Sequence, residues 1–168
     1  SGQGAVTALD AVTGEVKSWR PPFDGPRRLG VGPDNIVWVP GYGTSQLGRF
    51  DPRSETWKVY DIPTQPKGFD LPYNITVNRT TGDVWITGAN SDSLIRFRPS
   101  TEEFTVFDLP TPVNFMREIE FDAEGAVWTC TSKATQMDPE PGSGRIIKLE
   151  LREREGSCGD GVVQLGED

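Results

Sequence analysis

Polar and charged residues recur just before short apolar segments of the chain, where they are suited to bind a ligand. Arg28, Asn74 and Arg117 occupy near-equivalent places of this kind. Guanidinium groups bind carboxylates and other anions through charge-assisted hydrogen bonds, and amides supply both donors and acceptors. The candidate site has six residues: Arg28, Tyr42, Asn74, Asn90, Arg117 and Glu118. We expect it to take a peptide or a small anionic ligand. In a second interpretation, which stays open, these residues hydrogen-bond only to one another and to water.

The sequence contains no histidine, which removes many enzyme mechanisms. A Ser–His–Asp triad, an imidazole general base and a histidine-ligated metal all need this side chain. The acidic residues Asp160, Glu167 and Asp168 do not have the spacing of a calcium-binding loop. We therefore predict no catalytic residue, no metal ligand and no cofactor in this chain.

The chain is acidic: 17 Lys and Arg residues stand against 25 Asp and Glu residues, for a net charge of −8. Binding to nucleic acid or to an anionic membrane needs clustered positive charge, whereas the longest basic run here is Arg27-Arg28. No apolar run approaches the roughly 20 residues of a transmembrane helix. We expect neither a nucleic-acid partner nor a membrane span.

The elements that would position the candidate site come from an internal repeat. The stretches NIVWVPG (35–41), GDVWITG (82–88) and GAVWTCT (125–131) each place a tryptophan after a turn and an apolar residue. These tryptophans are 47 and 43 residues apart. A repeat of this length with four strands is typical of a β-propeller blade.

Each repeat divides into four short segments with alternating apolar and polar residues, which predicts half-buried strands separated by turns. Three full blades are predicted at residues 27–63, 72–110 and 116–151, and the third and fourth strands of an opening blade at 5–22. The predicted fold class is all-β. Residues 1–151 form a partial β-propeller of about three and a half four-stranded blades, and an acidic, Gly-rich tail follows at 152–168.

Further residues are expected to be equivalent between repeats. The third strands share Arg49, Arg96 and Arg145, and the fourth strands share Trp19, Trp57 and Phe104. The tryptophan of each second strand is predicted to fill the wedge between neighbouring blades, since such a ring buries roughly 150–250 Å². Because known propellers have roughly four to eight blades, we expect another segment or chain to complete the ring.

The motifs Gly32-Pro33-Asp34, Trp38, Leu47-Gly48-Arg49-Phe50 and Ile62-Pro63-Thr64 recur in part at 84–97 with 108–112. This pattern resembles the streptogramin lyase (virginiamycin B lyase) family of seven-bladed propellers, over about residues 5–151. The resemblance implies a seven-bladed ring. It also implies a lyase that opens a cyclic depsipeptide with the help of a divalent metal and of His and Glu residues.

The chain departs from that family where the chemistry lies. The family's second strand commonly reads Trp-Phe-Thr-Glu, and the place of the Glu is taken here by Gly41, Gly88 and Thr131. A divalent metal is therefore expected only on the basis of the family resemblance. Two hypotheses result. The first is a non-catalytic binding or scaffold module that acts through its loop face and its open edges. The alternative is a lyase- or lactonase-type enzyme whose catalytic residues lie in the missing half.

The C-terminal stretch CGDGVVQLGED (158–168) resembles the opening of a Cys-rich repeat found in secreted proteins of myxobacteria-like bacteria. This resemblance implies an extracellular or periplasmic location, and the alternative is a flexible acidic tail. Cys130 and Cys158 are candidates for one disulfide. Alternatively, Cys130 is a buried thiol beside Trp128, and the partner of Cys158 lies outside this chain.

Overall fold

The computed structural model describes residues 4–64, 66–110, 114–131 and 144–151. This part of the chain contains thirteen β-strands. They are β1 (Val6–Leu9), β2 (Val16–Trp19), β3 (Gly30–Val31), β4 (Val37–Gly41), β5 (Gln46–Asp51), β6 (Thr56–Asp61), β7 (Pro72–Val77), β8 (Val84–Gly88), β9 (Ser93–Arg98), β10 (Glu103–Asp108), β11 (Met116–Phe121), β12 (Val127–Thr131) and β13 (Ile146–Leu149). None of these residues belongs to a helix with the length and apolar character that a membrane span requires.

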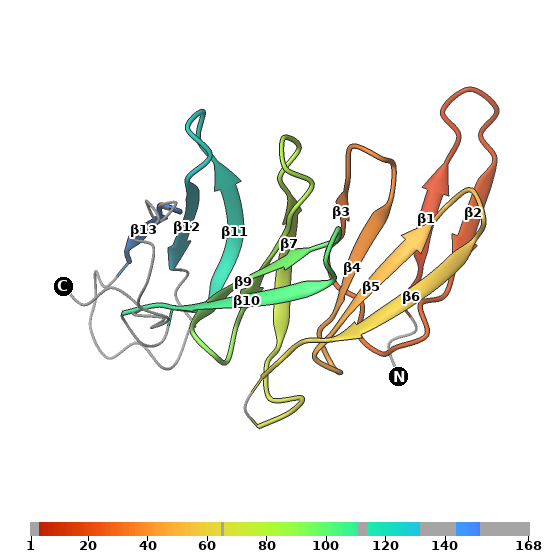
Figure 1. Ribbon diagram of the computed structural model, residues 1–168. Helices are drawn as coiled ribbons and strands as arrows, with labels where there is room; N and C mark the ends of the chain where they lie inside the picture. Colours follow the sequence, from red (N-terminus) through yellow and green to blue (C-terminus); the bar gives the residue numbers. More distant parts are fainter. Residues whose placement is uncertain (1–3, 65, 111–113, 132–143, 152–168) are drawn as a thin grey trace.

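The strands form four antiparallel sheets in which neighbours in sequence are neighbours in space. Sheet one holds β1–β2, sheet two β3–β6, sheet three β7–β10 and sheet four β11–β13. Figure 1 shows the four sheets side by side in chain order. Strand β7 contacts both β3 and β11, so these three are the inner strands of successive blades. The all-β partial propeller predicted from the repeat is confirmed, and we number its blades one to four. Of the full blade predicted at 116–151, the described residues show three strands.

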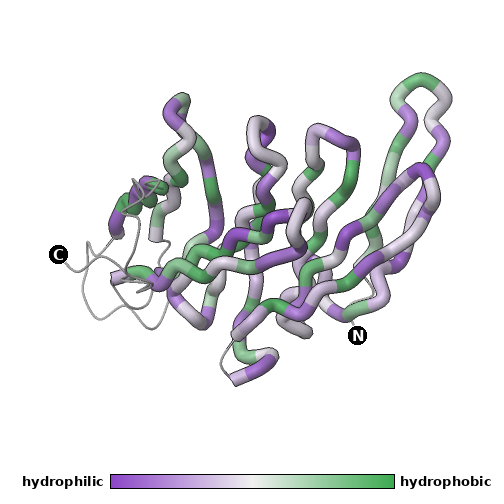
Figure 2. Tube along the Cα trace, viewed as in Figure 1, coloured by the Kyte–Doolittle hydropathy of each residue, from purple (hydrophilic) through white to green (hydrophobic). Residues whose placement is uncertain are grey.

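The blades are held together by apolar residues between neighbouring sheets. Trp38 of blade two packs on Phe97 of blade three with ring centroids 5.5 Å apart. Trp85 of blade three faces Phe121 of blade four at 6.5 Å. Both tryptophans are 2% exposed, whereas Trp128 of blade four is 36% exposed. Figure 2 shows hydrophobic residues along the strands and hydrophilic residues at the tips of the β7–β8 and β11–β12 turns.

The strand register corrects the predicted place of Arg145. Trp85 lies opposite Arg96 on β9, and Trp128 lies opposite Lys148 on β13. Lys148 therefore takes the position of Arg96, and its Nζ lies 5.3 Å from the centre of the Trp128 ring. Arg145 precedes β13, three positions earlier. Because the cation on this strand changes from Arg to Lys, a search for arginine alone selects the wrong residue.

The prediction for Trp19 was also shifted by three positions. The structure pairs Trp19 with Val6, Tyr60 with Leu47 and Phe107 with Leu94. Trp19 is thus equivalent to Tyr60 and Phe107, not to Trp57 and Phe104. The fourth strands of blades two and three each carry two aromatic residues three positions apart, so an aromatic residue alone does not fix the register.

An ion pair repeats between the outer strands of neighbouring blades. Lys17 Nζ lies 3.4 Å from Glu55 Oε1, and Lys58 Nζ lies 2.7 Å from Glu102 Oε2. Glu55 and Glu102 have positive φ values of 56° and 58° at the end of a hairpin turn, where blade one has Gly14. Few L-residues adopt this conformation. The positive φ repeats here at Glu55 and Glu102, and each of these carboxylates contacts a lysine of the preceding blade.

We predict that Trp85→Ala destabilises the fold far more than Trp128→Ala. Removing the buried Trp85 ring leaves a cavity and should cost roughly 3–5 kcal/mol, as large core truncations do. Trp128 is 36% exposed, so its truncation should cost about 1 kcal/mol or less. Urea denaturation followed by far-UV circular dichroism measures both. Equal losses would contradict the wedge role of Trp85, and Trp85→Phe should recover part of the loss.

We also predict an acid-dependent contribution from Glu102. Hydrogen bonds from Lys58, and next from the Tyr60 hydroxyl, lower the pKa of Glu102 below the ordinary value of a glutamate carboxyl. A carboxyl with a lowered folded-state pKa stabilises the protein above its unfolded pKa, and this stabilisation is lost as the pH falls through the folded-state pKa. Glu102→Gln should therefore lower the urea midpoint at pH 7, and the difference from wild type should shrink towards pH 3.

The matched control for Glu102 is Glu103→Gln, which removes the same charge from the neighbouring exposed residue. It should change the midpoint little at either pH. A loss in Glu102→Gln that persists in full at pH 3 would show that the carboxylate charge is not its cause.

Candidate functional site

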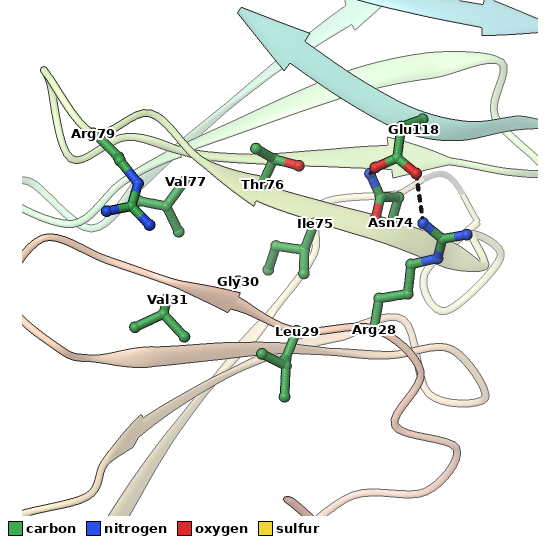
Figure 3. Close-up of a pocket in the computed structure, with 10 residues that line it drawn as sticks. All are labelled: Arg28, Leu29, Gly30, Val31, Asn74, Ile75, Thr76, Val77, Arg79 and Glu118. Atoms are coloured by element: carbon green, nitrogen blue, oxygen red, sulfur yellow. Dashed lines mark hydrogen bonds and ion pairs between the residues drawn. The ribbon is translucent and has the colours of Figure 1, made fainter. Parts of the chain in front are cut away.

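The inner strands carry a groove that contains half of the predicted site. The groove has a volume of about 570 Å³ and lies along β3 and β7. Figure 3 shows its lining residues: Arg28, Leu29, Gly30, Val31, Asn74, Ile75, Thr76, Val77, Arg79 and Glu118. Arg28, Asn74 and Glu118 point towards one another at one end of this inner-strand groove, and Arg79 lies at the other end.

Irregularities in the strands bring these polar residues to the groove. The register of β7 against β8 shifts between Pro72 and Ile75, and that of β11 against β12 shifts between Met116 and Ile119. A bulge of this kind redirects side chains and is frequent next to functional sites. Asn74 and Glu118 fall inside the two shifts. The same local device thus places both residues, although their sequences differ.

The three groove residues are bound to one another. Arg28 Nη1 donates to Glu118 Oε2 at 2.7 Å, and Asn74 Nδ2 donates to Glu118 Oε1 at 3.3 Å. Asn74 is 2% exposed, while the side chains of Arg28 and Glu118 are 43% and 52% exposed. Glu118, rather than Arg117, therefore meets Arg28 and Asn74 in the groove. The Glu118 carboxylate neutralises Arg28 and orients the buried amide.

Two other predicted residues lie beside the groove in a second group of side chains. Tyr42 and Arg117 belong to a set that combines three guanidinium groups with three aromatic rings. We call this set the arginine–aromatic cluster: Arg27, Arg28, Tyr42, Tyr73, Phe115 and Arg117. Arg27 Cζ lies 4.0 Å from the centre of the Tyr42 ring, which is cation–π contact. The candidate site predicted from the sequence includes Arg28, Tyr42 and Arg117 of this cluster but not Arg27, Tyr73 or Phe115.

Asn90, the sixth predicted residue, lies in the β8–β9 turn and hydrogen-bonds to the loop before β7. Its Nδ2 donates to the Phe69 carbonyl at 3.0 Å, and its backbone N–H donates to Asp70 Oδ1 at 3.1 Å. Asp70 is fully buried and also accepts a hydrogen bond from the Ser91 hydroxyl at 2.8 Å. Asp70 thus ties the loop before β7 to the β8–β9 turn. Sequence reasoning missed it, although the Phe-Asp pair at 69–70 repeats the pair at 23–24 and offered a signal.

The described residues contain no group of three or more His, Cys, Asp or Glu side chains arranged to hold a metal ion. Cys130 lies exposed on β12, which corrects the alternative of a buried thiol. Its proposed disulfide partner Cys158 and the tail at 152–168 lie outside the described residues. The disulfide and the Cys-rich repeat therefore stay predictions.

Solved structures similar to this chain are β-propellers of several kinds. Virginiamycin B lyase from Staphylococcus aureus matches with a TM-score of 0.68 and 19% identity, over 90% of this chain and 50% of the lyase chain. A dihydro-heme d1 dehydrogenase gives 0.67 and 14% over 89% of this chain and 31% of its own. The extracellular domain of a one component system from B. thetaiotaomicron gives 0.62 and 16%, over 76% and 17%.

No protein-family model and no curated protein sequence matches the chain. At these identities the structural matches establish the fold, and the resemblance to the streptogramin lyases holds at that level. The chain spans about half the length of the lyases it matches. Since propellers host unrelated activities, function has to be argued from the site.

We predict a small but measurable coupling between Arg28 and Glu118. Because both side chains are partly exposed, the pair should contribute about 0.2–1 kcal/mol in a double-mutant cycle of Arg28→Gln and Glu118→Gln. Urea denaturation of the two single variants and the double variant measures it. Arg28→Gln combined with Glu124→Gln, in the β11–β12 turn, should be additive. A coupling as small as in this control would mean that the ion pair does not hold the groove together.

Proposed function

We propose that this chain is a non-catalytic binding and scaffold module, one part of a propeller ring that another protein segment or chain completes. One observation supports the proposal above others. The first described sheet has an open strand edge, and the last has an open apolar face. In blades two and three, the equivalent edge is paired with another strand and the equivalent face is covered by the next blade. Open strand edges and exposed apolar faces favour association with other chains.

The open edge belongs to β1. Asp10 N–H donates to the Glu15 carbonyl at 2.9 Å, which sets the alternation of hydrogen bonds along the β1–β2 hairpin. By that alternation the N–H groups of Thr7 and Leu9 point away from β2. The equivalent strand of blade two, β5, uses this edge to pair with β4. Two strands arranged like β3 and β4 would therefore complete blade one.

The open face belongs to blade four. Trp128 is 36% exposed and Ile146, which pairs with Cys130, is 77% exposed. In blades two and three, the next blade buries the equivalent tryptophans to 2% exposure. A further blade placed against β11–β13 would cover Trp128 in the same way. The proposal therefore assigns a completing segment to the edge of β1 and to the face of blade four.

The ligand of this module would bind where the loops and the inner strands meet, through the candidate residues at the groove. A peptide or a small anionic ligand suits the guanidinium groups there. The C-terminal resemblance to secreted Cys-rich repeats supports an extracellular or periplasmic location for the protein. Among the solved structures, the matching domain from B. thetaiotaomicron is extracellular.

A second candidate function has one observation in its favour, the match to half of the virginiamycin B lyase chain. In this alternative, a lyase- or lactonase-type enzyme has its catalytic groups, and any divalent metal, in the completing segment. His and Glu residues of that segment that face the inner-strand groove would support the enzyme. A completing segment without such residues would support the binding module.

We predict that the isolated chain does not behave as a stable monomer. Native mass spectrometry and light scattering should find assemblies larger than 18.5 kDa, held through the open face or the open edge. Trp128→Arg should shift the chain towards monomer because a charge opposes burial of that face. Thr7→Pro should do so because it removes an N–H from the open edge and none from the β1–β2 hairpin.

Val12→Arg is the matched control, since Val12 is 95% exposed at the tip of the β1–β2 turn. It should leave the assemblies unchanged. A monodisperse 18.5-kDa monomer with one cooperative unfolding transition would contradict the proposal.

A further inference from the structure

Three guanidinium groups of the arginine–aromatic cluster gather around the ring of Tyr73. The Cζ atoms of Arg27, Arg28 and Arg117 lie 5.2, 5.5 and 5.7 Å from its centre. Arg117 also lies 4.9 Å from the centre of the Phe115 ring. These residues come from three separate segments of the chain, so it is the fold that brings the positive charges together.

The positive charge of the cluster is only partly neutralised. Glu118 pairs with Arg28 at 2.7 Å. For Arg27 and Arg117, no carboxylate of the described residues lies within ion-pair distance, and both side chains are exposed. The cluster thus gathers three arginines around one ring, with a carboxylate paired to only one of them in the part of the chain that the structure describes, although the chain has a net charge of −8.

The rings hold the two guanidinium groups without using their hydrogen-bond donors. A guanidinium that contacts the face of a ring keeps its N–H edge available, and this edge matches the two oxygens of a carboxylate. Arg27 lies over Tyr42 at 4.0 Å, and Arg117 lies over Phe115 at 4.9 Å. Both arginines are therefore supported from one side and open to a negatively charged ligand.

We propose that the arginine–aromatic cluster binds an extended acidic peptide, with one carboxylate on Arg27 and a second on Arg117. The two Cζ atoms are at most about 11 Å apart, the sum of their distances to the Tyr73 centre. Alternate residues of an extended chain lie on one face and about 6.6 Å apart, and flexible Asp side chains cover the remaining distance. The ligand is thus an Asp-X-Asp segment or its Glu equivalent. This inference deepens the proposed binding function and rests on it.

The test is calorimetric titration of the 168-residue chain with the capped peptide Ala-Asp-Ala-Asp-Ala at low ionic strength. We expect saturable binding that weakens steeply with added salt, and no binding of Ala-Asn-Ala-Asn-Ala. Arg27→Gln and Arg117→Gln should each weaken binding about fivefold to tenfold. Arg53→Gln removes the same charge from an exposed turn between β5 and β6 and should leave binding unchanged. Far-UV circular dichroism checks that each variant is folded.

Several results would overturn the proposal: no binding of the acidic peptide, equal binding of the Asn peptide, or an equal effect of Arg53→Gln. Inorganic phosphate that displaces the peptide with the same affinity would also overturn it, because the site would then take any small oxyanion. The state of assembly is measured separately by mass. A monomeric chain that binds the peptide would therefore contradict ring completion and leave this inference standing.

Discussion

The structure depends on one constraint: each four-stranded sheet has two faces that must be covered by its neighbours. Trp38 and Trp85 show how this is met, because each ring is buried against the next blade. Hydrophobic burial of rings this large stabilises the fold more than the ion pairs that repeat between the outer strands, because water screens exposed charges. The same constraint explains why Trp128 is partly exposed: blade four is the last blade of the described residues, so no further blade covers its ring.

The fold could be predicted from the sequence because the constraint leaves a periodic trace. A tryptophan recurs after a turn, and four alternating segments recur around it. The register could not be predicted to the same accuracy. The fourth strands carry two aromatic residues each, and the loop before β13 differs in length from its counterparts, so Trp19 and Arg145 were both placed three positions away from their true equivalents. The hydrogen bonds between strands determine which residues are equivalent, and the sequence pattern alone does not reveal those hydrogen bonds.

The candidate site was predicted in part, and the reason lies in the backbone. Loop position alone selected Arg28, Tyr42, Asn74, Arg117 and Glu118, which do lie around the inner-strand groove and the arginine–aromatic cluster. The contacts among these residues depend on the register shifts in β7 and β11. No local sequence pattern predicts these shifts. Asn90 was selected by the same rule, yet it hydrogen-bonds to the neighbouring loop before β7, where the buried carboxylate of Asp70 accepts from its backbone.

The overall charge determines how such a site can select a ligand. With a net charge of −8, the chain repels anions at long range, and salt screens this repulsion beyond a Debye length of about 8 Å in physiological conditions. An anion therefore gains binding energy only when it reaches the guanidinium groups themselves. A ligand that brings two carboxylates to Arg27 and Arg117 together makes both contacts for one loss of translational and rotational freedom, so the site favours paired carboxylates over a single one.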